Sequence, residues 1–345
     1  MIEINETPVR TSKSFNINSI SVDDVIFPAI VTEFENVSIE KNNSNIDDEF
    51  NSIDLKYGIG AIAKNNINSY YNNCINIITA KNDIINIEYT FDDDNLNLIN
   101  QINIDAENSC DIYVKLFSET KNECFHNGAI KLKAHKNVKV NVYLINLLNN
   151  KSTHLESIEN ELDENSIVNY TIIDFGASLS ASNYYTNVLG NNASNDLKTI
   201  YIGTDKSKRD LNYIVHMNGE KTNVDIDVQG TLKDEASKNF KGTIDFKKGC
   251  KKAVGNENEY CVLLSDEAKS IALPMLLCTE EDVEGNHSTA SGTVDKQKLF
   301  YMMSRGISYN DAVKLIIRAN FNKIIERVKD SDLKSIIIEE LEKRI

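Results

Sequence analysis

The sequence predicts a mainly β protein that ends in α-helices. From about residue 68, short stretches in which β-branched or aromatic residues alternate with polar ones follow one another, each bounded by Asn, Asp, Gly or Ser. After Gly292, apolar residues recur instead at the three- and four-residue spacing of amphipathic helices. Only three prolines occur among 345 residues, so little interrupts the strands.

Residues 1–67 predict an irregular lead-in. Its apolar pieces, such as Val25–Val31, are short and lie among many Asn, Asp and Ser residues, which indicates a few strands and one short helix at most. The run Asn42–Asp48 has the composition of an exposed loop.

Residues 68–292 predict the strand-rich body. In KLKAHKNVKVNVYL, four apolar residues face one way and the lysines and asparagines face the other: Val138, Val140, Val142 and Leu144. Many strands in series are compatible with a sandwich, a barrel or a β-solenoid. Four glycines lie 11, 12 and 7 residues apart: Gly219, Gly230, Gly242 and Gly249. This spacing suits the turns of short stacked rungs, although a meander also fits.

Residues 293–345 predict three helices. The first runs over Val294–Ser304 and ends at Gly306. Ser308 is a suitable N-cap for the second helix, and Ser331 for the third. The apolar stripe of the second helix comprises Val313, Ile316, Ile317, Phe321, Ile324 and Val328, and that of the third comprises Leu333, Ile336, Ile337 and Leu341.

The net charge of −15 argues against nucleic acid or an anionic membrane as the main partner. The segment from Val294 to Ile345 has eleven Lys/Arg and eight Asp/Glu residues, so it carries about +3 and the remainder about −18. A mildly basic, amphipathic tail on an acidic body suits a docking element, and a helix with a mixed solvated face suits the same pattern equally.

The N-terminus has no apolar core of signal-peptide length, and no window approaches a membrane span. We therefore expect a cytoplasmic protein with reduced thiols instead of disulfides. No CxxC motif occurs, which argues against a zinc ribbon. The six cysteines are Cys74, Cys110, Cys124, Cys250, Cys261 and Cys278.

No phosphate-binding glycine loop, HExxH, GxSxG or paired-carboxylate motif occurs, so we expect no enzyme activity in this chain itself. The metal-capable residues near the strand-to-helix switch are Cys250, Glu259, Cys261, Cys278 and His287. Small residues around His287 leave room for a ligand, and neutral imidazole binds iron or zinc. The alternative is a histidine that hydrogen-bonds within a turn, with cysteines packed as small apolar residues.

Three segments, in order, resemble the SufB/SufD family of iron–sulfur cluster assembly scaffold proteins. They are IVHMNGEKTNVDIDVQGTLKDEASKNFKGTI, YCVLLSDEAKSIALPMLLCTEEDVEGNHSTASG and VDKQKLFYMMSRGISYNDAVKLIIRANF, within about Asp205 to Phe321. Residues 68–204 agree in pattern only. The resemblance implies a right-handed parallel β-helix with a C-terminal helical domain, which selects among the three open architectures.

The resemblance also implies partners and a cargo. A SufC-like ABC-type ATPase would dock on the C-terminal helices and hydrolyse ATP, while a second copy or a SufB/SufD paralogue would pair through the β-helix. A transient iron–sulfur cluster would form at that dimer interface. The residues expected to contact the ATPase are Phe300, Arg305, Ile316, Ile317 and Phe321.

The resemblance also implies roles for individual site residues. His287 matches the histidine of the family's DDV-x-x-x-H segment, a cluster ligand on the SufD side. Glu259 stands where SufB has a key cysteine, so thiolates would come from Cys261, Cys278 or Cys250. Ser288 replaces a SufB glutamate, so the chain matches neither member cleanly.

A second hypothesis comes from a different class of function. A β-solenoid could instead act on polysaccharides or serve as a structural module. Such enzymes line one strand face with aromatic and acidic residues, whereas the Tyr and Phe residues here are scattered.

Overall fold

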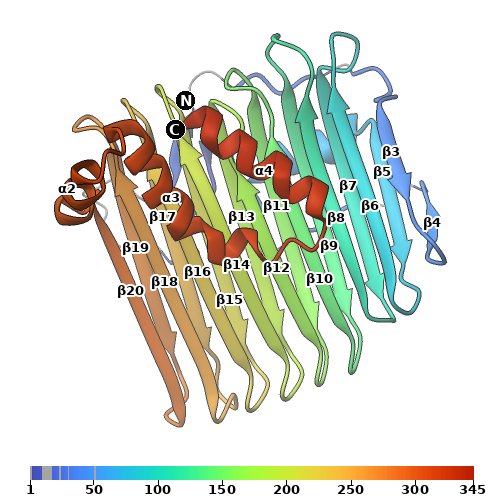
Figure 1. Ribbon diagram of the computed structural model, residues 1–345. Helices are drawn as coiled ribbons and strands as arrows, with labels where there is room; N and C mark the ends of the chain where they lie inside the picture. Colours follow the sequence, from blue (N-terminus) through green and yellow to red (C-terminus); the bar gives the residue numbers. More distant parts are fainter. Residues whose placement is uncertain (1, 10–17, 23–24, 30, 50–51) are drawn as a thin grey trace.

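The computed structural model describes residues 2–9, 18–22, 25–29, 31–49 and 52–345, so residues 10–17 of the predicted lead-in lie outside it. Over the described residues the chain winds into a β-solenoid of about eight turns, followed by helices (Figure 1). The predicted β-helix with a helical C-terminal part is thereby confirmed. Among the described helices, none has an apolar stretch long enough to reach across a bilayer.

Two nine-stranded sheets form the solenoid. The front sheet comprises β3 (Val37–Glu40), β6 (Asp83–Phe91), β8 (Cys110–Ser118), β10 (Lys139–Leu147), β12 (Ile167–Asp174), β14 (Ser194–Gly203), β16 (Asn223–Leu232), β18 (Ala253–Leu263) and β20 (Val283–Thr293). The back sheet comprises β4 (Asn45–Asp47), β5 (Asn73–Ile78), β7 (Asn97–Ala106), β9 (Phe125–Ala134), β11 (Thr153–Leu162), β13 (Leu179–Val188), β15 (Lys208–Met217), β17 (Ser237–Phe246) and β19 (Lys269–Cys278).

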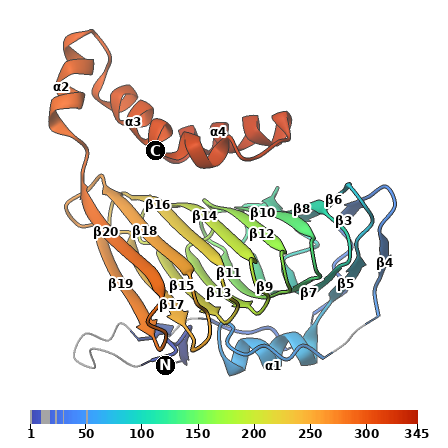
Figure 2. The same cartoon turned by 90° about the horizontal axis from the view of Figure 1, so that it is seen from below.

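The remaining elements flank the sheets. Strands β1 (Ile2–Ile4) and β2 (Ile20–Val22) form an antiparallel pair. The helices are α1 (Ala61–Tyr70), α2 (Lys296–Ser304), α3 (Tyr309–Ile325) and α4 (Ser331–Arg344). Figure 2 shows α3 and α4 outside the front sheet and α1 outside the back sheet, with the solenoid between them.

The strands stack in parallel except at one end. Register partners on neighbouring rungs lie about thirty residues apart, as for Val140 with Val168 and Ser194 with Asn223. Among the described strands of the two nine-stranded sheets, only the short strands β3 and β4 pair antiparallel, with β6 and β5. Because a parallel register repeats the in–out alternation on every rung, inward residues of successive rungs stack into rows. Val138, Val140, Val142 and Leu144 all lie in the shared core, as their alternation predicts.

The corners between the sheets use residues in the left-handed backbone region. Asn137, Asn165 and Asn192 have φ between 56° and 61° and occupy the same corner on three consecutive rungs. Asparagine tolerates this conformation better than most other residues. The Asn165 amide donates to Asn137 (3.0 Å) and the Asn192 amide to Asn165 (3.1 Å), so the corner is also a side-chain ladder.

Two of the four glycines expected at turns lie inside strands instead. Gly230 is on β16 and Gly242 is on β17. A Cβ at Gly230 would lie 1.9 Å from the ring of Tyr201, and one at Gly242 would lie 2.0 Å from the carboxylate of Glu257. These glycines therefore give space to large side chains, that of Tyr201 on the adjacent strand and that of Glu257 on the facing sheet, which corrects the turn interpretation.

Helices α3 and α4 pack on the outer face of the front sheet. Their buried apolar residues join those of the strands in one cluster, in which Phe321 lies against Phe175 with ring centroids 6.2 Å apart. Ser308 caps α3, as predicted, and Gly306 has φ 89°. Helix α4 is capped by Asp330, one residue earlier than predicted, because its carboxylate accepts from two backbone amides.

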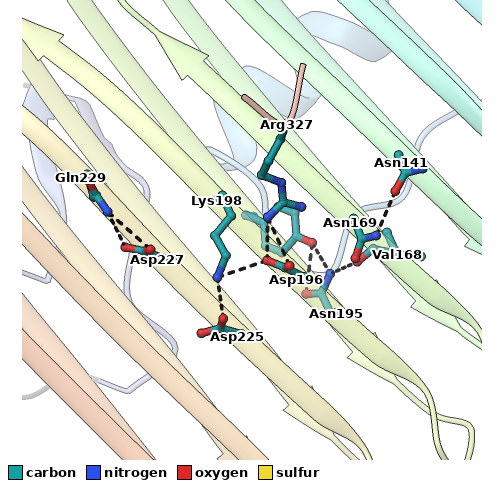
Figure 3. Close-up of polar contacts among 11 residues, drawn as sticks. Asn141, Val168, Asn169, Asn195, Asp196, Lys198, Asp225, Asp227, Gln229 and Arg327 are labelled. Atoms are coloured by element: carbon teal, nitrogen blue, oxygen red, sulfur yellow. Dashed lines mark hydrogen bonds and ion pairs between the residues drawn. The ribbon is translucent and has the colours of Figure 1, made fainter. Parts of the chain in front are cut away.

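Polar contacts fix the helices beside this apolar cluster (Figure 3). Arg327, just after α3, donates to both oxygens of Asp196 at 3.1 and 3.2 Å. Lys198 then bridges Asp196 (3.2 Å) and Asp225 (2.6 Å) on the adjacent strand. The C-terminal helices are thus held to the solenoid by an apolar stripe and an ion-pair network.

Two boundaries differ from the sequence prediction. Helix α2 begins at Lys296, with Asp295 as its N-cap, two residues later than expected. The expected loop Asn42–Asp48 contains strand β4, which pairs with β5 at the end of the back sheet. Short strands paired on one side only carry too few apolar residues to be recognised by alternation.

Replacing Phe321 with Ala should lower the free energy of unfolding by about 3–5 kcal/mol, because it empties a buried aromatic site. Urea denaturation followed by circular dichroism measures this change. Phe300→Ala is the matched control: its side chain is 75% exposed, so stability should stay within about 0.5 kcal/mol of the wild type. Equal effects of the two substitutions would contradict the packing described for α3.

Candidate functional site at the open end of the solenoid

The last rung of the solenoid, formed by β19 and β20, is open to solvent. Within the part of the chain that the structure describes, strand β20 pairs only with β18, and β19 only with β17, so each has an unpaired backbone edge. Nearly every residue of β20 is exposed, in contrast to the strands below it. An unpaired edge is a template for pairing with another chain.

The inward face of the last two front-sheet strands carries the metal-capable residues. Glu257, Glu259 and Cys261 alternate along β18 and so project to one side. Their register partners on β20 are His287, Thr289 and Ser291, respectively. His287 therefore lies one strand above Glu257, at the ~4.8 Å strand spacing.

Glu257 has no hydrogen-bond partner among the described residues, although its side chain is fully buried. Both carboxylate oxygens point into the solenoid where Gly242 leaves space. Burial, helped by the nearby charge of Glu259, raises the pKa of Glu257 to about 8. A buried carboxyl group without a partner is costly, and such groups are found at functional sites.

Glu259 is already engaged in a buried ion pair. The Lys238 ammonium lies 2.7 Å from Glu259 Oε1, and the Tyr201 hydroxyl donates to the same oxygen at 3.3 Å. All three side chains are almost completely buried. Freeing this carboxylate would leave Lys238 unpaired in the interior, which is strongly unfavourable.

The predicted thiols lie apart from one another. Among the six cysteines, all within described residues, only Cys278 is exposed; it ends β19 and donates to the carbonyl oxygen of Glu280 (2.8 Å). Cys261 is buried, and burial raises the pKa of its thiol. Cys261 lies four positions along β18 from Glu257, which is ~13 Å. His287 and Glu257 are thus brought together, whereas Cys261 is not.

The predicted docking residues divide into two groups. Ile317 and Phe321 are buried against the chain's own front sheet, and Ile316 is half-buried, so this stripe belongs to the core described above. Phe300 and Arg305 are exposed on or next to α2. Helical periodicity predicts that an apolar stripe is buried, but not which surface buries it. In this chain the front sheet of the solenoid buries the stripe.

Helix α2 carries an exposed apolar surface, which we define as the α2 patch: Phe300, Tyr301, Met303 and Arg305. None of the residues of α2 is buried. Phe300, Tyr301 and Met303 are 75%, 59% and 45% exposed, and the Arg305 guanidinium lies 5.3 Å from the Tyr301 ring centre. In Figure 2 the helix stands clear of the sheets.

Sequence reasoning missed Glu257 and its surroundings. The alternation that groups Glu259 with Cys261 also places Glu257 on the same face, so its position was available from the sequence. Two other features depend on how the two sheets pack and could not be predicted from the sequence. They are the lack of hydrogen-bond partners for Glu257 among the described residues and the pairing of Glu259 with Lys238, 21 residues earlier.

Comparison with known proteins gives one consistent result. The family model described as "SUF system FeS cluster assembly, SufBD core domain" matches residues 89–320. The chain is 29% identical to the iron–sulfur cluster assembly protein SufD of Bacillus subtilis over 161 residues, which are 46% of this chain and 37% of that protein. It is 27% identical to SufD of Escherichia coli over 114 residues, 33% of this chain and 27% of that protein.

An archaeal relative is similar to the same degree. The SufBD family protein of Pyrococcus horikoshii is 29% identical over 130 residues, which are 38% of this chain and 29% of that protein. The chain therefore matches well under half of the length of each of these relatives.

Replacing Glu257 with Gln should make the free energy of unfolding less dependent on pH. In the wild type the pKa of this carboxyl rises from 4.5 to about 8 on folding, so between these values the folded chain holds a proton that the unfolded chain has released. The free energy of unfolding therefore falls as pH rises through this window, by up to ~1.4 kcal/mol per pH unit from this group.

Urea denaturation at pH 5, 6, 7 and 8 measures the slope for the wild type and Glu257→Gln. The exposed residue Glu284, on β20, provides the matched control Glu284→Gln, which should keep the wild-type slope. The same slope in Glu257→Gln and wild type would show that Glu257 is solvated in the folded chain.

Proposed function

The chain belongs to the SufBD core-domain family of the SUF iron–sulfur cluster assembly system, and from this membership we propose that it is a scaffold subunit on which an iron–sulfur cluster is built. The match over residues 89–320 carries the proposal, because it includes the solenoid from the end of β6 onward together with α2 and most of α3. The relatives named SufD support it. A polysaccharide-acting or purely structural solenoid is not favoured by these matches.

We place cluster assembly at the open end of the solenoid. Iron and sulfide are the substrates there, and the His287 imidazole offers an exposed nitrogen at the last strand. The carboxyl of Glu257 lies one strand deeper and has two oxygens without hydrogen-bond partners among the described residues. Iron bound by this carboxylate would replace the proton that Glu257 holds at neutral pH.

Thiolates complete the proposed ligand set. Cys278 is the accessible thiol on the last rung, while Cys261 reaches the cluster only if the last rung moves aside. Glu259 neutralises Lys238 and keeps the interior ion pair intact. Tetrahedral iron in clusters is held mainly by thiolates, so His287 and Cys278 of one chain are an incomplete set.

A second chain supplies the remainder in this proposal. The unpaired edges of β19 and β20 suit association with another copy or with a SufB/SufD paralogue. Each partner would contribute its own last rung, so that the cluster forms between two open ends.

The α2 patch is the proposed dock for a SufC-like ABC-type ATPase. Three exposed apolar side chains beside one arginine form a compact anchor of the kind enriched at the centres of interfaces. ATP hydrolysis in that partner would reshape the scaffold interface, and this chain would contribute no catalytic residue. Because α3 and α4 are fixed to the front sheet, movement of the docked partner would be transmitted to the solenoid.

His287→Ala should lower the cluster yield several-fold without changing the fold, because the side chain is exposed. Anaerobic reconstitution of the chain, together with its ATPase partner, with iron and sulfide measures yield as visible absorbance and iron per complex. His135→Ala removes a histidine that instead pairs with Asp105 (2.6 Å) and should leave the yield unchanged. Equal yields from wild type and His287→Ala would remove His287 from the site.

Phe300→Asp should abolish co-purification with the ATPase while leaving circular dichroism and the melting temperature unchanged. Ile336→Asp is the matched control, because Ile336 is a 42% exposed apolar residue on α4, away from the α2 patch. The control should retain the partner. Retention of the ATPase by Phe300→Asp would exclude the α2 patch as the dock.

A further inference from the structure

A second group of metal-capable side chains lies inside the solenoid, away from the open end. His126 projects inward from β9, and His154 and Glu156 project inward from the adjacent strand β11. Their ligand-capable atoms all lie within 4.8 Å of one another, and each residue is at least 94% buried. Strand β11 is four strands from the β19 edge, which is ~19 Å.

The two imidazoles offer nitrogen atoms at close range. His126 and His154 are register partners, and their Nδ1 atoms are 2.8 Å apart. His126 Nε2 lies 3.0 Å from the side-chain oxygen of Asn100, which can only accept, so Nε2 carries the proton and Nδ1 carries a lone pair. A hydrogen bond of this kind on the far nitrogen orients histidine ligands in metal sites.

Both histidines are neutral at physiological pH. Burial lowers the pKa of His126 well below its usual value, with a further contribution from His154. Burial also lowers the pKa of His154 to about 4, against the opposing effect of Asp174. Neutral imidazole is the form that binds metal ions.

Glu156 completes the group with an oxygen that has no partner. Its Oε1 makes no hydrogen bond to any described residue, and burial raises the pKa of the carboxyl to about 8. A cavity of about 20 Å³ lies beside it. Its lining is mostly apolar, its polar residues include His154, Glu156, Asp174, Ser180 and Ser182, and His126 lies outside the lining. This volume accommodates one small species such as a water molecule or a metal ion.

We propose that His126, His154 and Glu156 bind one divalent first-row transition-metal ion inside the solenoid, at a site separate from the one where the cluster is built. Two imidazole nitrogens and one carboxylate are a donor set for Fe²⁺ and Zn²⁺. Two nitrogens bound to one ion at ~2.1 Å lie ~3.0 Å apart at an octahedral right angle and ~3.4 Å apart at a tetrahedral angle, so the Nδ1 atoms, now 2.8 Å apart, need to separate by ~0.2–0.6 Å to share an ion.

Metal binding would move one proton within the site and release another. In the metal-free chain one proton lies between the two Nδ1 atoms and belongs to His154, because His126 uses its own proton toward Asn100. When the ion takes that place, the proton moves to Nε2 of His154, so this imidazole stays neutral. The Glu156 proton is released to solvent, and no oxidation or reduction takes place.

The surroundings make room for this arrangement. A Cβ at position 128 would lie 2.7 Å from the His126 ring and 2.9 Å from the Asn100 oxygen, so only glycine fits there. The ion would connect β9 with β11 and satisfy a carboxyl oxygen that otherwise has no partner in the interior. We therefore expect it to stabilise the middle of the solenoid.

Cobalt titration of the full chain tests the proposal. Because the site is buried, Co²⁺ is added during refolding of the chelator-treated chain from urea, under anaerobic conditions. We expect one Co²⁺ per chain with weak visible d–d absorption, no thiolate-to-cobalt charge-transfer band, and a melting temperature several degrees higher. No stoichiometric uptake, or a strong thiolate band that accounts for all of it, would overturn the proposal.

Variants assign the ion to its ligands. Glu156→Gln keeps the shape of the side chain, and we expect Co²⁺ to bind at least tenfold more weakly; His126→Asn should bind none. If His126→Asn fails to fold by circular dichroism, Glu156→Gln decides, and wild-type affinity in that variant would overturn the site.

A further variant separates this inference from the proposed function. His287→Ala should retain the interior Co²⁺ with unchanged affinity and spectrum, whatever its cluster yield. Loss of the stoichiometric Co²⁺ in His287→Ala would place the ion at the open end and overturn the interior site. Cluster yield in Glu156→Gln then reports on the assembly function independently.

Discussion

Parallel stacking of rungs in register is the constraint on which the rest of the structure depends. Once each strand lies directly above another, every inward side chain must fit those on the rungs before and after it. Gly230 and Gly242 exist as glycines because Tyr201 and Glu257 fill the space that a Cβ would need. The same register places His287 over Glu257 and His126 beside His154. Neither pair is close in sequence, and both follow from one repeat.

The interior of the solenoid contains many buried polar groups, and they fall into two kinds. Most are satisfied: Tyr170 donates to Asn160 at 2.8 Å, and Lys238 pairs with Glu259 at 2.7 Å. Two buried glutamates, Glu156 and Glu257, have carboxylate oxygens without hydrogen-bond partners among the described residues. Burial raises the pKa of both carboxyls to about 8. One lies in the middle of the solenoid and the other beneath its open end. An unsatisfied buried carboxyl lowers stability, which makes these two places the ones where a ligand would contribute most.

Local periodicity predicted the strand-rich body and the helix positions, whereas the choice of a β-helix over a sandwich or a barrel came from the family resemblance. The alternation of Val138 to Leu144 and the N-cap at Ser308 are examples that the structure confirms. The sequence could not show what covers the predicted docking residues Ile317 and Phe321, since an apolar stripe has the same pattern whether a partner or the chain's own sheet covers it. The role of Glu257 and the pairing of His126 with His154, 28 residues later, depend on register and burial, which no local pattern contains.

The two ends of the solenoid differ in a way that limits how chains can associate. At one end β3 and β4, only four and three residues long, run antiparallel to their neighbours and leave little backbone for further pairing. At the other end β19 and β20 present long free edges. If two chains pair through these free edges, as proposed above, both edges are used within the pair and only the short-strand ends remain outside. Such pairing would give closed pairs and not growing fibres.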